Sequence, residues 1–203
     1  MDEIVKAAIA KWPNVPHCYG WLALDARGQW RMRDERCQAL KLPGDIIRHP
    51  ALIDFINRNY QCDDQGCWYF QNGPQRVYVE LEATPFIAHT TPTGLRLHTG
   101  QVMQSIIGAY FDESGHLVFA SENTLAQVDD RDVAECLNWI RIDGHECIDD
   151  DLLLWLEQTT LSVKAHIFVS NVEVIVQKEN VGSLMKKRGY TPHPSNTNAH
   201  KDI

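Results

Sequence analysis

The chain has 203 residues, with 19 lysines and arginines against 27 aspartates and glutamates, so its formal charge is -8. This acidic balance argues against a general nucleic-acid binder, which needs a basic surface to neutralise phosphates. No apolar run approaches the roughly 18 residues that a membrane span requires. The opening MDEIVKAAIAKW lacks the features of a signal peptide. We therefore expect a cytoplasmic protein that binds neither nucleic acid nor membrane, and whose six cysteines are reduced.

Hydrophobic spacing and turn residues predict the elements of the first half. In chain order they are a helix at 4–12, strands at 19–25 and 29–33, a helix at 50–60, a hairpin at 62–73 and a strand with period-two alternation at 76–86. Pro13 and Pro16 end the first helix, because proline cannot continue the hydrogen-bond ladder. Pro50 fits the first turn of the second helix, where its missing N–H costs nothing.

The sequence of the second half also predicts both helices and strands. This half carries the whole net charge, with 16 acidic and 8 basic residues after position 100. Its expected elements are strands within 94–100 and 102–120, a helix at 129–140, a helix at 149–158, strands at 163–169 and 172–178, and a helix at 181–189. Aspartates begin the helices at 129 and 149, where acids can cap free N–H groups. The tail 191–203 is polar and proline-containing, so we expect it to be disordered.

One turn pattern occurs three times, as Asp25-x-x-Gly28-x-Trp30, Asp63-x-x-Gly66-x-Trp68 and Asp112-x-x-Gly115-x-Leu117. Aspartate accepts hydrogen bonds from turn N–H groups, glycine adopts a positive φ, and large alternating residues on the returning strand face a core. We interpret the pattern as a β-hairpin that is combined with a helix more than once. The alternative is that any protein rich in β-turns yields such triplets.

The succession DARGQWRM, RHPALIDFI, DDQGCWYF and VYVELEATPF resembles the uncharacterised proteobacterial proteins grouped as domain-of-unknown-function family 1285 (DUF1285). The resemblance covers roughly residues 19–90. The segments KWPNVPHCYGWLALD and FQNGPQRVYVELEATPF look closer to a sister proteobacterial family, also of unknown function. The resemblance implies repeated hairpin–helix motifs in two small domains and a part in signalling or ligand sensing. It implies no catalytic residues.

Glu80 and Glu82 are the strongest candidates for a chemical role. Residues two apart on a strand share a face, roughly 7 Å from each other, which suits paired-carboxylate acid–base work. Arg76 and Tyr78 would extend that face. The alternative interpretation is the solvated side of an amphipathic sheet.

Arg96 and His98 alternate with leucines in the same way. If their strand pairs with the one at 76–82, a surface of carboxylate, arginine and imidazole would suit a polar ligand. That pairing is a hypothesis, because no motif supports it.

Other groups of reactive residues have simpler structural explanations. His17 and Cys18 are neighbours on a strand and point to opposite faces, so the imidazole is badly placed to activate the thiol. The spacing of Cys62 and Cys67 completes no zinc motif. The acidic run from Asp143 to Asp151 lacks the pattern of a calcium loop, and helix capping explains its aspartates. We expect no metal and no cofactor.

The sequence thus predicts an α+β fold of repeated antiparallel hairpins and helices in two small subdomains, at 1–92 and 93–190. The leading functional hypothesis is a non-enzymatic protein that binds a small ligand or a protein partner through Arg76, Tyr78, Glu80, Glu82, Arg96 and His98. One alternative is a hydrolase-type enzyme that uses the Glu80/Glu82 face. Another is a homo-oligomeric scaffold, for which a homodimer is the simplest assembly.

Overall fold

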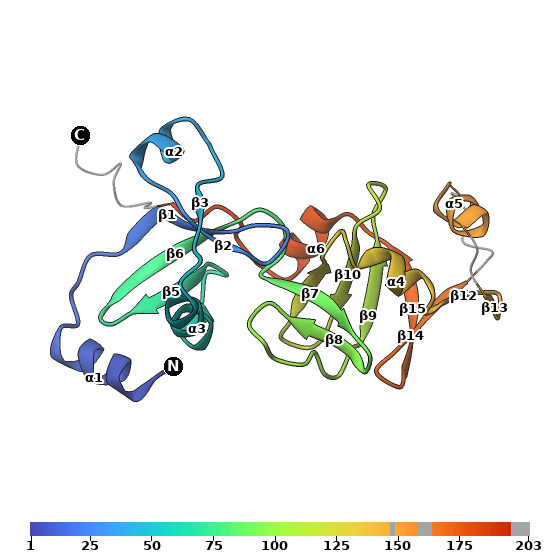
Figure 1. Ribbon diagram of the computed structural model, residues 1–203, viewed down its shortest axis with the longest axis horizontal. Helices are drawn as coiled ribbons and strands as arrows, with labels where there is room; N and C mark the ends of the chain where they lie inside the picture. Colours follow the sequence, from blue (N-terminus) through green and yellow to red (C-terminus); the bar gives the residue numbers. More distant parts are fainter. Residues whose placement is uncertain (147–148, 158–163, 196–203) are drawn as a thin grey trace. The chain divides into compact units, whose positions relative to one another are not determined.

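The fold is known from a computed structural model, which describes residues 1–146, 149–157 and 164–195 (Figure 1). It is a mixed α/β structure in which two separate sheets carry most of the regular backbone. The chain divides into two compact units. Unit 1 comprises residues 1–25, 29–83 and 185–203, and unit 2 comprises residues 26–28 and 84–184. The α+β class with two subdomains is therefore confirmed.

Unit 1 is built on a six-stranded sheet of order β3-β2-β1-β6-β5-β4. Its strands are β1 (Cys18–Leu24), β2 (Trp30–Met32), β3 (Asp45–Ile46), β4 (Tyr60–Cys62), β5 (Trp68–Asn72) and β6 (Gln75–Leu81). Neighbours pair antiparallel, except that β1 and β6 run parallel at the centre. Its helices are α1 (Glu3–Lys11), α2 (Glu35–Ala39) and α3 (Pro50–Arg58). The ring of Phe55 in α3 packs edge-on against Phe70 of β5, which fixes α3 on the sheet.

Unit 2 is built on a nine-stranded sheet of order β13-β12-β14-β15-β9-β10-β11-β7-β8. Its strands are β7 (Phe86–Thr91), β8 (Gly94–Leu97), β9 (Gly108–Phe111), β10 (Leu117–Ala120), β11 (Leu125–Val128), β12 (Ile140–Ile142), β13 (His145–Glu146), β14 (Ala165–Val169) and β15 (Val172–Lys178). Its helices are α4 (Val133–Leu137) and α5 (Asp149–Glu157), and α6 (Val181–Lys187) begins in this unit. Trp155 of α5 and Phe111 of β9 are among the buried side chains of one contiguous core. Among the described helices, none is both long and apolar enough to cross a bilayer.

The three predicted Asp–Gly turns are present and share one hydrogen-bond pattern. In each turn the aspartate N–H donates to the carbonyl oxygen four residues later, and the same residue's N–H donates back to the aspartate Oδ1. The three glycines have φ between +75° and +82°. The pattern therefore closes β1 onto β2, β4 onto β5 and β9 onto β10.

Several sequence predictions differ from the structure in their boundaries. The strand predicted at 76–86 is two strands, because β6 ends at Leu81 and β7 joins the other sheet. The division of the chain accordingly falls between residues 83 and 84 rather than at 92. The helix predicted at 129–140 is shorter in the structure, where α4 spans only Val133–Leu137. The Asp132 carboxylate does not cap it. That carboxylate instead lies 3.2 Å from the His89 ring.

The predicted disorder of the tail is wrong for residues 191–195. Thr191 donates its N–H to the Gly66 carbonyl, and the Pro192 carbonyl accepts the Leu81 N–H. These bonds were missed because backbone groups, rather than apolar side chains, attach the segment to unit 1. Residues 196–203 and Cys147 lie outside the described residues.

Two of the turn glycines give a matched test of this fold. A Cβ on Gly66 would lie 1.7 Å from the Gly189 carbonyl oxygen, whereas one on Gly115 would meet nothing within 4 Å. We expect Gly115→Ala to lower the free energy of unfolding by about 1–2 kcal/mol, the cost of a positive φ. Gly66→Ala should cost clearly more, because backbone must also move. Urea unfolding followed by circular dichroism measures both, and equal losses would contradict the packing at Gly66.

Candidate functional site

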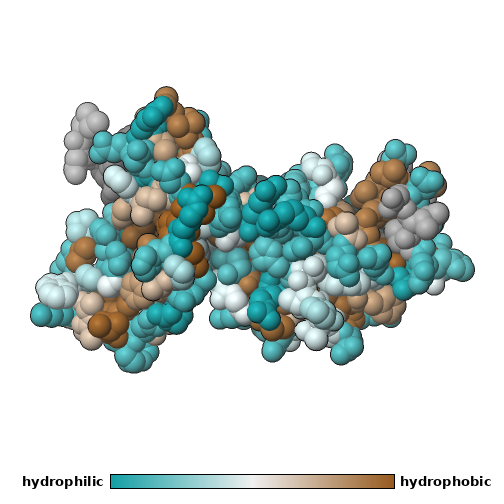
Figure 2. All heavy atoms as spheres, viewed as in Figure 1, coloured by the Kyte–Doolittle hydropathy of each residue, from teal (hydrophilic) through white to brown (hydrophobic). Residues whose placement is uncertain are grey.

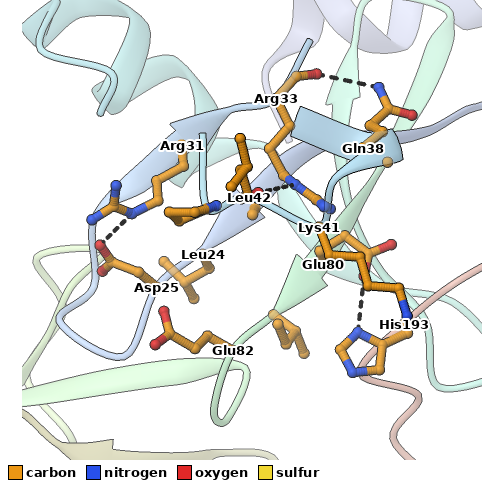
Figure 3. A pocket seen from close by; sticks show the side chains of 14 residues that line it. Leu24, Asp25, Arg31, Arg33, Gln38, Lys41, Leu42, Glu80, Glu82 and His193 are labelled. Atoms are coloured by element: carbon orange, nitrogen blue, oxygen red, sulfur yellow. Dashed lines mark hydrogen bonds and ion pairs between the residues drawn. The ribbon is translucent and has the colours of Figure 1, made fainter. Parts of the chain in front are cut away.

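Unit 1 contains an open pocket of about 650 Å³ beside the paired strands β1 and β6. Its walls come from these strands, from β2, and from α2 with the loop that follows it. The lining residues are Gly20, Ala23, Leu24, Asp25, Arg31, Arg33, Gln38, Lys41, Leu42, Pro43, Glu80, Leu81, Glu82 and His193. We call this the unit 1 pocket (Figure 3).

An irregularity in β1 shapes one wall of the unit 1 pocket. Cys18 pairs with Val77, but the next pair is Leu22 with Val79, so β1 holds two extra residues. A bulge of this kind bends a strand and commonly lies beside a functional site. Gly20 lies within it at φ +79°, and a Cβ there would lie 2.6 Å from the Gln38 side-chain oxygen. The bulge and the missing side chain thus allow α2 to approach the sheet.

A buried ion pair lies at one side of the pocket. The Arg31 Nε donates to Asp25 Oδ2 at 2.7 Å, and Asp25 is only 4% exposed. The other oxygen of Asp25 closes the β1–β2 turn, and Arg31 also donates to the Gly44 carbonyl. Because each charge has its partner, the pair contributes little net charge to a ligand.

The loop after α2 brings two further cations to the pocket. Arg33 donates from Nε to the Leu42 carbonyl at 3.2 Å, which holds the loop across the end of β2. Lys41, in the same loop, is exposed and has φ +53°. No ion pair of Arg33 or Lys41 occurs among the residues that the structure describes.

The opposite wall carries the two predicted carboxylates. Glu80 is half-buried and pairs through the backbone with Ala23 of β1, while Glu82 is exposed just beyond the end of β6. The Glu80 Oε2 lies 2.9 Å from the His193 Nδ1. Figure 3 shows His193 facing Glu80 and Arg31 facing Asp25 at two separate places in the pocket.

Arg76 and Tyr78 share the strand of the two glutamates but do not line the pocket. The Tyr78 ring stacks on Tyr19 with centroids 4.6 Å apart, and its hydroxyl donates to Asp63 Oδ2 at 2.9 Å. Burial raises the pKa of the Tyr78 phenol to about 12. Arg76 lies over the ring of Tyr69. These two predicted residues therefore belong to an aromatic cluster of unit 1.

The hypothesis that the strand of Arg96 and His98 pairs with β6 is wrong. β8 pairs with β7 in the nine-stranded sheet, whereas β6 pairs with β1 and β5. Arg96 is exposed, opposite His89 of β7. His98 accepts the Ile87 N–H on Nδ1, and burial, with a smaller effect of His89, lowers its pKa to about 3. A neutral imidazole that bonds to backbone serves the fold of unit 2.

Sequence reasoning missed five polar residues of the pocket, namely Asp25, Arg31, Arg33, Lys41 and His193. Asp25 could have been found, because it opens the first Asp–Gly turn. Arg31 and Arg33 alternate with Trp30 and Met32, which places them on one face of a strand. Nothing in the sequence indicates that His193 returns to Glu80, 113 residues earlier in the chain.

The other reactive groups considered above show no activation. Burial raises the pKa values of the Cys18 and Cys62 thiols, which disfavours the nucleophilic thiolate. The ring of His17 packs edge-on against Tyr78. Within the described ranges, no three side chains of histidine, cysteine, aspartate or glutamate are grouped as a metal site requires.

The buried state of His98 predicts how stability depends on pH. The pKa of about 3 in the folded chain lies below the ordinary 6.5, so the unfolded chain binds more protons between these values. The free energy of unfolding therefore has its full contribution from neutral His98 above pH 6.5, and it falls as the pH drops toward 3. We expect a loss of about 2–3 kcal/mol at about pH 4.5, from roughly 1.4 kcal/mol per pH unit.

Urea unfolding of unit 2 at neutral pH and at about pH 4.5 measures this loss. His98→Gln should remove the pH dependence, although it also lowers stability at neutral pH. His145→Gln, at an exposed position of β13, is the matched control and should leave the dependence unchanged. The interpretation fails if His98→Gln keeps the full pH dependence.

Two solved structures were found to be similar, and both are described as DUF1285 family proteins. The protein from Silicibacter pomeroyi DSS-3 is 11% identical, with a TM-score of 0.49, and the match covers 86% of this chain and 94% of that one. The protein from Shewanella baltica OS155 is 12% identical, with a TM-score of 0.37, over 55% of this chain and 85% of that one. No curated protein matches the sequence.

A family model identifies the group more directly. The model labelled DUF2944 and described as "Protein of unknown function (DUF2946)" matches residues 1–195. This agrees with the expectation of a family of unknown function. The chain therefore belongs to the DUF2944 family of proteins of unknown function.

Proposed function

We propose that the chain is a non-enzymatic binding protein whose unit 1 pocket takes a small zwitterionic molecule of the amino-acid class. The observation that carries this proposal is the separation of unlike charges on two walls of one pocket. Arg33 and Lys41 come from the segments around α2, while Glu80 and Glu82 come from β6 and its end. A molecule with one carboxylate and one ammonium group complements both walls.

Charged side chains of the pocket that form no ion pair within the protein are the ones that can bind a ligand. Arg31 and Asp25 neutralise each other, and Asp25 is buried. Arg33 keeps guanidinium N–H groups beyond its bond to the loop, and Lys41 keeps its ammonium group. These donors suit a carboxylate, because charge-assisted hydrogen bonds are about twice as strong as neutral ones.

The carboxylate wall suits the cationic end of the ligand. Glu80 uses Oε2 for His193, and no hydrogen bond of its Oε1 occurs among the described residues. His193 is 73% exposed and lies at the rim, where a ligand could displace it. The side chain of Leu42, which is 39% exposed, provides apolar contact for the body of a small molecule, whereas Leu24 and Leu81 are almost fully buried beneath the pocket.

The hydrolase alternative uses the same two glutamates. It requires one carboxyl group that is protonated and one that is ionised, because different surroundings give the two groups different pKa values. Turnover of the bound molecule would identify that alternative, so the binding experiment also tests it.

A cytosolic sensor of an amino-acid-like metabolite would fit the signalling role that the resemblance implies. The five described cysteines are free thiols, which supports a reducing compartment.

Binding of the standard amino acids, measured by calorimetry on the full chain, tests the proposal. We expect one or a few to bind, and the N-acetyl and carboxamide derivatives of the best binder to bind at least about tenfold more weakly. Each derivative removes one charge, and a hydrogen bond to a charged group contributes about 1.5–3 kcal/mol. Native mass spectrometry of protein from its own host would show a retained ligand, a bound protein partner or a homodimer.

Two variants assign the binding to this pocket. Lys41→Ala and Glu82→Gln should each weaken binding several-fold, with the former affecting the carboxylate end and the latter the ammonium end. Glu113→Gln, an exposed acid in unit 2, is the matched control and should bind as the natural chain does. The proposal is overturned if no amino acid binds, or if removing either ligand charge leaves the affinity unchanged.

A further inference from the structure

Unit 2 has a hollow of its own between the tips of two hairpins, with a volume of about 700 Å³. One tip joins β7 to β8 at Pro92 and Thr93, and the other joins β14 to β15 at Ser170 and Asn171. The chemistry of the hollow comes from two aromatic residues and two acids. They are Trp139, Phe168, Glu135 and Glu173.

The two aromatic residues are neighbours, with Trp139 in the turn just before β12 and Phe168 on β14. The Phe168 N–H donates to the Trp139 carbonyl at 2.9 Å, at the start of the β12–β14 pairing. Residues opposite each other in a sheet project from the same face. Trp139 is half-buried and Phe168 is 48% exposed, so both rings present surface to the hollow. The ring of Trp139 also packs against the core of unit 2, so Phe168 is the ring that is left largely open to solvent.

The acids lie next to these rings. Glu173 is the β15 partner of Phe168 and therefore shares its face. Its Oε1 lies 2.8 Å from the His166 Nδ1, and Glu135 in α4 forms no ion pair among the described residues. The described lining includes no lysine or arginine. The hollow itself is therefore acidic, while Arg141 and Lys164 line a neighbouring pocket that shares Phe168 and Glu173.

The wall formed by the two tips is closely packed. A Cβ on Gly94 would lie 2.0 Å from the Ser170 Oγ, so any larger residue here would have to displace that hydroxyl. Ser170 and Asn171 both have positive φ, as a two-residue hairpin turn of type I′ requires. A fixed wall limits the entropy lost when a small ligand binds.

We propose that this hollow binds an alkylammonium ion. The ion would lie against the faces of Trp139 and Phe168, which attract cations through the ring quadrupole. Glu135 and Glu173 would supply the opposite charge. Unit 2 also exposes apolar side chains on α5, among them Leu153 and Leu154, and Figure 2 shows hydrophobic surface over that helix. The proposal is independent of the unit 1 pocket, so either can fail without the other.

Fluorine NMR on protein labelled with 5-fluorotryptophan tests the proposal directly. The Trp139 resonance is assigned by its loss in Trp139→Phe. Choline chloride is titrated to roughly 100 mM, since partly exposed rings give millimolar affinity. Its neutral isostere 3,3-dimethyl-1-butanol serves as the control. We expect choline to move the Trp139 resonance saturably and the neutral isostere to leave it in place.

Variants separate a cation site from a merely apolar one. Phe168→Leu keeps an apolar side chain but removes the ring, and Glu135→Gln removes one charge; each should raise the Kd for choline by about two- to fivefold. Glu113→Gln, outside the hollow, should leave it unchanged. The proposal is overturned if choline and its neutral isostere act alike, if no shift occurs, or if both variants bind as the natural chain does.

A second arm identifies the source of the ammonium group. Nα-acetyl-lysine methylamide replaces choline in the same titration. Tighter binding of the lysine derivative points to a lysine side chain of a protein, and tighter binding of choline points to a small quaternary ammonium metabolite. Both results support an ammonium site, and failure of both cations overturns it.

Discussion

The hydrogen bond from a turn N–H to an aspartate carboxylate is the interaction on which both sheets depend. It occurs in the same form at Asp25, Asp63 and Asp112, and each time it reverses the chain so that two strands can pair. The second oxygen of each aspartate has a different partner. It binds Arg31 beside the unit 1 pocket, the hydroxyl of Tyr78 in the aromatic cluster, and the ring of His116 in unit 2. The same aspartate carboxylate thus joins the backbone of each hairpin turn to a different neighbouring side chain.

Local features of this fold could be predicted because their causes are local. The three turns follow from aspartate and glycine at a fixed spacing, and the amphipathic helix at Pro50–Arg58 follows from its apolar spacing. The parallel pairing of β1 with β6 could not be predicted, because it joins strands about fifty residues apart and leaves no pattern in either. The short strands β3 and β13 have two residues each, too few for any periodicity to be seen.

The candidate site was predicted only where alternation along one strand was sufficient. Glu80 and Glu82 were predicted to share one strand face; Glu80 lies on β6 and Glu82 just beyond its end, and both line the unit 1 pocket. The same alternation also included Arg76 and Tyr78, whose surroundings differ because aromatic rings from other strands cover that end of β6. The basic wall depends on how the loop after α2 folds against the bulge in β1. That arrangement is a property of tertiary packing, and no single segment encodes it.

The return of residues 185–195 to unit 1 has a consequence for how the chain folds during its synthesis on the ribosome. Domains generally fold as units in the order in which they are synthesised. Here the Leu81 N–H and the Gly66 carbonyl find their partners only at Pro192 and Thr191, more than a hundred residues later. Unit 2, between residues 84 and 184, is translated in the meantime and can complete its own sheet first. The portion of the chain that emerges first is therefore among the last to be finished, and until then it presents unpaired backbone to chaperones and proteases.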